Sequence, residues 1–238
     1  MKGKSLARSL IPAYFVVIIG IVLIALFGNR AYTAFSESHI TDKRRCIIID
    51  AGHGGMDGGA TSCTGVLESN INLEIALRLN DLCQLLGMKT IMIRTTDCSI
   101  HTEGESIAAK KVSDLKNRVS IVNGENNPIL VSIHQNYFHD SQYSGAQVFY
   151  GKGEGSASLA RDLQMQFVNT INQGSNRKAK KASGIYLMDK ITCTGVLVEC
   201  GFISNFQEEQ LLLNKEYQKK VCCVIASGCS TYLYGSTA

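Results

Sequence analysis

The hydrophobic pattern of the chain switches repeatedly between short apolar runs and helical periods. Ile47, Ile48 and Ile49 form a β-branched run that is too short for a helix core, so it predicts a buried strand. Residues 89–94 form a second such run. Between the two runs, apolar residues recur at helical spacing at Ile71, Ile75, Leu79, Leu82 and Leu86. Strand, helix and strand in this order predict a parallel pair joined by a crossover helix.

The same alternation continues to the end of the chain. Polar residues 95–111 predict a long loop, and Ser69 and Gly87 are expected to cap and to end the first helix. Further strands are predicted at residues 128–133, 145–150 and 195–198, and helices at 112–124, 156–172, 208–213 and 216–233. We therefore expect a single α/β domain over residues 46–234, with a mostly parallel twisted sheet flanked by helices on both faces.

An apolar stretch without charged residues precedes the predicted domain at residues 10–27, and residues 1–9 before it are basic. Its length exceeds the roughly 7–15 apolar residues of a secretory signal and lies at the lower end of the about 17–25 residues of a spanning helix. Small-residue cleavage sites after it are poor. We expect an uncleaved membrane anchor rather than a signal, with residues 28–45 as a linker and the domain exported to the extracytoplasmic face.

Composition narrows the class of protein. The chain has 238 residues, 45% of them hydrophobic and 18% charged, which fits a globular core and not disorder. The net charge of +4 is lower than a nucleic-acid-binding domain usually carries. A basic run at residues 176–181 is interpreted as solvated surface or as a contact for glycan or protein.

The nine cysteines show no CxxC pair, and no disulfide is predicted. Five of them lie in apolar patterns and are expected to be buried thiols: Cys46, Cys83, Cys200, Cys222 and Cys223.

The candidate catalytic and metal-binding residues lie where predicted strands end. His53, His134 and Glu199 follow three apolar runs, and the carboxyl ends of parallel strands meet at one edge of a sheet. Glu68, just before the first helix, lies on that edge if the crossover is ordinary. Two histidines and two glutamates suggest a catalytic zinc site, in which three side chains bind the metal and one glutamate remains as a base.

Five motifs carry a resemblance over residues 46–234: IIIDAGHGG, GVLESNINLEIA, ILVSIHQN, SGAQVFY and GVLVECGFISN. In these motifs the chain resembles the zinc-dependent N-acetylmuramoyl-L-alanine amidases of the amidase-3 family. The resemblance implies that His53, Glu68 and His134 hold one zinc ion per chain and that Glu199 is the catalytic glutamate. It also implies hydrolysis of the amide between N-acetylmuramic acid and L-alanine in peptidoglycan.

Residues 176–202 resemble the sporulation branch of that family, which prepares spore cortex for muramic-δ-lactam formation. This resemblance implies glycan strands and stem peptides as substrate and a place at the developing spore cortex. An accessory protein is a further candidate partner. No nucleic acid is expected as a partner.

Several assignments stay open at this point. Asp50 either supports a ligand imidazole or caps the strand end, and Asn136 is a second candidate for metal support or substrate contact. Arg94 and Arg118 are expected to form structural ion pairs. The alternatives to an amidase are a non-catalytic wall-binding or scaffolding module on the same fold, a zinc carboxypeptidase, and a nucleotide-binding protein. The last lacks the GxxxxGK[ST] motif.

Overall fold

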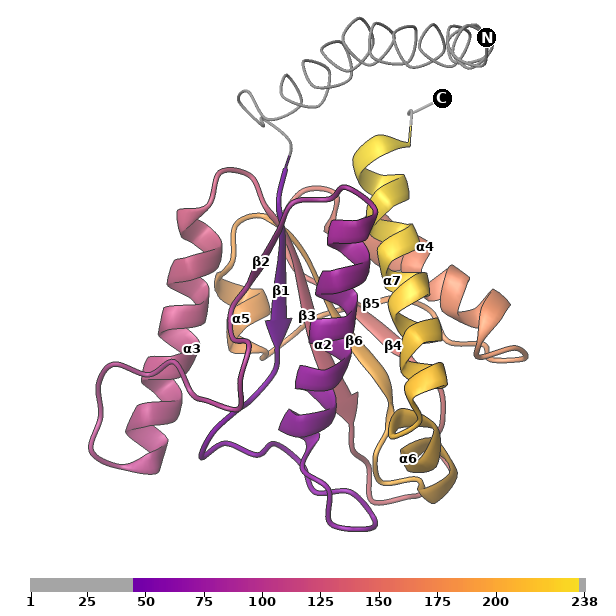
Figure 1. Ribbon diagram of the computed structural model, residues 1–238, viewed down its shortest axis with the longest axis horizontal. Coiled ribbons are helices and arrows are strands. Elements are labelled where there is room, and N and C mark those ends of the chain that lie inside the picture. The colour runs from indigo at the N-terminus through magenta and orange to yellow at the C-terminus, as the bar shows by residue number, and fades with distance from the viewer. Residues whose placement is uncertain (1–44, 236–238) are drawn as a thin grey trace, which may run out of the picture. The chain divides into compact units, whose positions relative to one another are not determined.

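A six-stranded mixed sheet forms the centre of the computed structural model, which describes residues 45–235 (Figure 1). Its strands are β1 (Ile47–Ala51), β2 (Thr90–Met92), β3 (Ile129–Asn136), β4 (Gln147–Tyr150), β5 (Lys180–Lys181) and β6 (Thr194–Phe202). They lie in the order β2-β1-β3-β6-β4-β5. All neighbouring pairs are parallel except β4 and β6, which are antiparallel. The sheet is therefore mostly parallel, as predicted.

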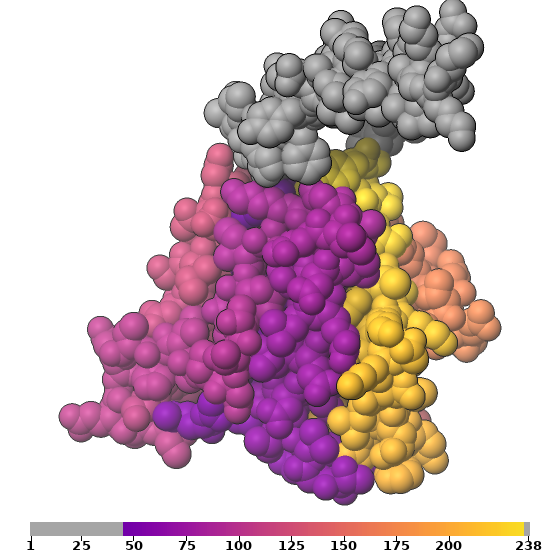
Figure 2. Space-filling view, in the orientation of Figure 1, coloured from indigo at the N-terminus to yellow at the C-terminus, as the bar shows by residue number. Residues whose placement is uncertain are grey.

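Helices cover both faces of the sheet because its central strands are apolar on both sides. Ile47 and Ile49 pack under α2 (Glu68–Leu85), α4 (Ser156–Thr170) and α7 (Lys215–Tyr234). Ile48 packs on the opposite face with α3 (Ile107–Gly124) and α5 (Tyr186–Lys190). The short α6 (Phe206–Leu212) adds Leu212 to the first core. Figure 2 shows α2 and α7 side by side on the surface.

Several boundaries differ from the sequence prediction. Helix α3 begins at Ile107 because the Ser106 hydroxyl accepts a hydrogen bond from Ala109 N at 3.1 Å, which shortens the predicted loop. Ser69 is not a cap, since the helix begins at Glu68 and the N-cap position is Leu67. The five-residue α5 was not predicted. These differences come from hydrogen bonds and caps that periodicity does not reveal.

All nine cysteines are free thiols. Cys46, Cys83, Cys200 and Cys222 are buried as expected, but Cys223 is exposed, because the adjacent Cys222 occupies the inner face of α7. The predicted membrane segment at residues 10–27 lies outside the described residues, as do residues 1–9 and the linker up to residue 44. Within residues 45–235, no helix combines the length and the hydrophobicity that crossing a bilayer requires.

Candidate metal centre and active site

His53 lies in the glycine-rich turn that follows β1, with a positive φ of 62°. Two groups fix it. Arg118 Nη2 donates to the His53 carbonyl at 2.7 Å, and Asp57 Oδ2 accepts from His53 Nδ1 at 2.9 Å. Burial alone would lower the pKa of His53, but hydrogen bonds with Asp57 and Glu68 outweigh it and raise the pKa to about 9. Carboxylates that favour a proton on this ring also favour a metal cation beside it.

Glu68 is the first residue of α2 and is buried. Its Oε2 lies 3.3 Å from His53 Nε2, and its Oε1 lies 3.0 Å from His134 Nδ1. Burial would raise the pKa of Glu68, yet the hydrogen bonds with the two imidazoles hold it well below its usual range. Glu68 is thus an ionised carboxylate placed between two histidines.

Other polar groups orient the Glu68 carboxylate. Oε2 accepts from Ala60 N at 3.0 Å, and Oε1 accepts from Gln135 N at 3.1 Å and from Asn72 Nδ2 at 3.2 Å. Asn72 is itself held, because its Oδ1 accepts from Gln135 Nε2 at 3.1 Å. The carboxylate is therefore oriented before any ion binds.

His134 and Glu199 are direct neighbours across the parallel pair β3 and β6. Both lie inside their strands rather than beyond the ends, because β3 continues to Asn136 and β6 to Phe202. The His134 ring packs against Gly52, where a Cβ atom would collide with it. This contact explains why glycine stands at position 52.

The side chains of His53, Glu68 and His134 meet the requirements of a zinc site. One ligand atom from each lies within 4.8 Å of the others. Ligands about 2.0–2.2 Å from a tetrahedral zinc ion stand roughly 3.3–3.6 Å apart. The distances from Glu68 to the two imidazoles, 3.0 and 3.3 Å, are close to this spacing. Two histidines and one carboxylate also match a common catalytic donor set.

Glu199 is half-buried on the same face of the sheet. Its Oε2 is enclosed and has no hydrogen-bond partner among the described residues. Burial raises the pKa of Glu199 to about 7; the electrostatic interaction with the His134 imidazole opposes the shift, and the negative charge of Glu68 adds to it. A carboxylate with a pKa near neutral pH and a free oxygen is suited to general base and acid catalysis.

Asp50 does not support a ligand imidazole, contrary to one of the two expectations. It is buried and pairs with Arg118 and with the Ser132 hydroxyl at 2.6 Å, whereas Asp57 takes the place beside His53. Arg118 also pairs with Asp114 at 2.6 Å, so its predicted ion pairs are confirmed.

Arg94 differs from the prediction, because no ion pair with it occurs within residues 45–235. It instead donates to four carbonyl oxygens, those of Ala51, Gly52, Ser69 and Thr96, at 2.8–3.0 Å. Arg94 and Arg118 therefore both stabilise the start of the histidine turn by donating hydrogen bonds to its carbonyl oxygens.

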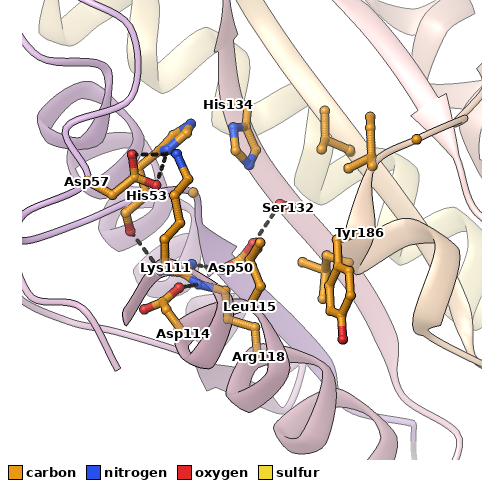
Figure 3. A pocket seen from close by; sticks show the side chains of 15 residues that line it. Asp50, His53, Asp57, Lys111, Asp114, Leu115, Arg118, Ser132, His134 and Tyr186 are labelled. Atoms are coloured by element: carbon orange, nitrogen blue, oxygen red, sulfur yellow. Dashed lines mark hydrogen bonds and ion pairs between the residues drawn. The ribbon is translucent and has the colours of Figure 1, made fainter. Parts of the chain in front are cut away.

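A pocket of about 370 Å³ opens beside the histidines, between α3 and the segment that leads into α5. Figure 3 shows Asp57 beside His53 and Lys111 reaching toward the same carboxylate; Lys111 Nζ lies 3.0 Å from Asp57 Oδ1. Leu115 and Tyr186 are also among its lining residues. The candidate metal centre is thus accessible to a substrate from this side.

Sequence reasoning missed Asp57 and Lys111. Asp57 lies four residues after His53, in the stretch GHGGMDGG, and this spacing was the available signal. Lys111 was assigned to a loop. Asn136, the other predicted support residue, is half-buried, and its carbonyl accepts from Ile203 N at 2.9 Å.

Comparison with known proteins agrees with this site. The family described as N-acetylmuramoyl-L-alanine amidase matches residues 47–231. The germination-specific N-acetylmuramoyl-L-alanine amidase of Bacillus subtilis is 38% identical over 190 residues, which are 79% of each chain.

Two solved structures are also similar. The CwlD amidase of Clostridioides difficile, determined in complex with the GerS lipoprotein, has a TM-score of 0.77 and 37% identity. The match covers 81% of this chain and 100% of that chain. An N-acetylmuramoyl-L-alanine amidase of Clostridium difficile 630 has a TM-score of 0.69 and 28% identity, with 82% and 100% covered.

Proposed function

Because this chain belongs to the N-acetylmuramoyl-L-alanine amidase family, we propose that it is a zinc hydrolase acting on peptidoglycan during spore cortex maturation. The bond cleaved is the amide between N-acetylmuramic acid and L-alanine, and removal of stem peptides prepares the glycan for muramic-δ-lactam formation. The observation that carries the proposal is the position of Glu199, with its free oxygen, next to His134 of the His53–Glu68–His134 set.

The residues of this chain have distinct tasks in the proposed reaction. His53, Glu68 and His134 would hold one zinc ion, which supplies a Lewis acid for the amide carbonyl and lowers the pKa of water. Glu199 takes the proton from the attacking water and then gives it to the leaving alanine nitrogen. Asp57 fixes the tautomer of His53 by accepting its Nδ1 proton.

Product analysis of purified peptidoglycan tests this proposal. We expect mass spectrometry to find released peptides with a free N-terminal L-alanine and muramic acid without peptide. A carboxypeptidase would instead shorten the peptides from their other end, and a non-catalytic module would release nothing. Either of those results would refute the amidase assignment.

Glu199→Gln separates metal binding from catalysis. We expect the variant to keep its zinc and to lose about 10²–10⁴-fold in rate, because the glutamine amide cannot accept the water proton. Glu154→Gln, at an exposed position, is the matched control and should keep full activity. If Glu199→Gln loses zinc, Glu199 is a ligand and Glu68 becomes the candidate base.

We also propose that residues 10–27 hold the catalytic domain on the outer face of a membrane. The support is their length and lack of charge, with a basic segment before them. Membrane fractionation of the full chain, with Ile19→Arg as the comparison, tests this. A full chain found in the soluble cytoplasmic fraction would refute the anchor.

An accessory protein is part of the proposal. The similar Clostridioides difficile amidase was determined in complex with a lipoprotein. We infer that this chain also binds a membrane-associated partner during sporulation. Affinity purification from sporulating and vegetative cells should recover such a partner only from the first, and recovery of the chain alone from both would contradict the inference.

A further inference from the structure

Arg177, between α4 and β5, has a guanidinium group that two contacts hold. Its Nε donates to the Ser144 carbonyl at 3.0 Å, and its central carbon lies 4.9 Å from the centre of the Phe202 ring. Within residues 45–235, no hydrogen bond or ion pair involves Nη1 or Nη2 of Arg177. Two donors with fixed direction therefore remain free, which is the arrangement that binds a carboxylate in two-point fashion.

Aromatic rings hold this guanidinium in place. Phe202 is buried, and the Tyr143 ring is stacked on it at a centroid distance of 6.1 Å. Phe138 packs edge-on against Tyr143 at 4.9 Å. Because the supporting rings contact one another, Arg177 loses little conformational freedom when a ligand binds.

Arg177 lines a cationic pocket of about 620 Å³. Lys178 and Lys180 also line it, and its lining contains no carboxylate. The acidic residue whose charge acts on Arg177, Glu208, has its Oε2 occupied by the backbone N–H groups of Gly145, at 2.7 Å, and Phe202, at 3.0 Å. The lining of the pocket therefore carries the positive charges of Arg177, Lys178 and Lys180 and no negative charge, and Glu208 acts on Arg177 from outside the lining.

This pocket is connected to the catalytic glutamate. Gln147, which lines it, lies directly opposite Glu199 across the antiparallel pair β4 and β6. Gln147 is 1% exposed, and its Oε1 has no hydrogen-bond partner among the described residues. Gln147 therefore links the lining of the pocket to the strand that carries Glu199.

The proposed reaction determines which part of the substrate lies near the pocket that Arg177 lines. Glu199 gives its proton to the leaving nitrogen, so the peptide leaves on the side of Glu199. Phe202 is three residues further along β6, about 10 Å away at 3.3 Å per residue. An extended peptide advances about 3.3–3.6 Å per residue, so its second or third residue reaches this distance.

We propose that Arg177, with Lys178 and Lys180, binds a carboxylate of the stem peptide two to three residues from the scissile amide. The inference rests on the proposed amidase function and makes Arg177 a specificity-determining residue. It predicts an amidase that distinguishes free from amidated stem-peptide carboxylates.

Two synthetic substrates test the inference with the full chain. One is a disaccharide muramoyl-tripeptide whose carboxylates beyond the alanine are all free, and the other is the same compound with all of them amidated. We expect kcat/KM of the wild type to be about tenfold or more higher for the acidic substrate, as charge-assisted hydrogen bonds predict. Arg177→Gln should remove most of this preference, because kcat/KM should fall much further for the acidic substrate than for the amidated one.

The controls separate recognition from folding and from net charge. Arg161→Gln changes the net charge by the same amount at an exposed position on α4, and it should keep the wild-type preference. Arg177→Lys keeps the charge but not the paired donors and should retain only part of the preference.

Three results would overturn the inference: equal use of both substrates by the wild type, equal losses for both substrates in Arg177→Gln, or the same loss in Arg161→Gln. Inactivity of the wild type on both substrates would refute the proposed amidase function, and with it this inference.

Discussion

Removal of the buried Arg118 guanidinium is expected to destabilise the domain mainly because the carboxylate of Asp50 loses its counter-ion. Arg118→Met keeps a side chain of similar length and removes the charge. Asp114 keeps hydrogen bonds from Ser99 Oγ at 2.9 Å and Ile100 N at 2.7 Å. Asp50 is 1% exposed and keeps only the Ser132 hydroxyl at 2.6 Å. The main cost therefore comes from Asp50, a buried charge without its counter-ion.

Breaking a buried ion pair by removing one partner costs about 3–5 kcal/mol in the free energy of unfolding. In a domain of this size, each kcal/mol lowers Tm by about 2–4 °C, so a decrease of roughly 6–20 °C is expected.

The loss should depend on pH. Burial acts to raise the pKa of Asp50, but Arg118 and Ser132 hold it below the usual 3.8 in the wild type. The wild type therefore gains stability from Asp50 above that pH and loses it on acidification. In the variant burial raises the pKa, so stability falls as the pH rises. The difference in the free energy of unfolding between the wild type and Arg118→Met should have its full size at pH 7 and decrease as the pH falls toward 3.8.

Urea unfolding of the metal-free proteins measures this effect without a contribution from zinc binding. Adding Asp50→Asn to Arg118→Met should restore much of the lost stability, because the orphaned charge is gone. Arg161→Met, at an exposed position, should change the free energy of unfolding by less than about 0.5 kcal/mol.

A loss below about 1 kcal/mol at pH 7 would refute the reasoning, since an uncompensated buried carboxylate costs more than that. An equal loss in the Arg118→Met and Asp50→Asn double variant would also refute it, because the cost would then not come from Asp50.

The remaining predictions concern the candidate metal centre. Asp57→Asn should weaken zinc binding about 10–100-fold, because the ligand imidazole beside it exchanges an anionic hydrogen-bond acceptor for a neutral one and becomes less basic; competition with a chromophoric chelator measures this, and Asp81→Asn should have no effect. Gly52→Ala should release most of the zinc, because the added methyl group would collide with the His134 ring; metal analysis showing a full complement would contradict it. In the metal-free protein, Glu199 should titrate near pH 7 because burial raises its pKa, and zinc should lower the midpoint. Carbon NMR of the glutamate carboxyls reports both values, and a midpoint near 4.5 without zinc would show that burial does not dominate.

The sequence predicted the elements that depend on local pattern. The run Ile47–Ile49 is buried on both faces of the sheet, as an unbroken β-branched run requires, and the helical period from Ile71 to Leu82 corresponds to α2. The motifs around His53, Glu68 and His134 indicated a shared edge, and the fold brings these three side chains together. Local pattern sufficed because it determines which face each element buries.

The tertiary structure decided which side chains meet. Asp50 and Asp57 both lie near His53 in the sequence, but Asp50 pairs with Arg118 and accepts a hydrogen bond from Ser132, and only Asp57 contacts the imidazole. Arg118 has two carboxylate partners, and Arg94 has carbonyl oxygens instead. The contacts of Asp50 with Arg118 and Ser132, and of Arg94 with Ala51, join residues more than forty positions apart, beyond the range of periodicity.

Strand direction was also a tertiary outcome. The alternating pattern of residues 145–150 predicted a strand, but only the fold shows that β4 runs antiparallel to β6 and places Gln147 opposite Glu199. The same packing brings Arg177 onto Phe202. A side-chain period of two specifies which residues lie on each face of a strand. It does not specify the neighbouring strand, the strand direction or the register, because these depend on contacts across the whole sheet.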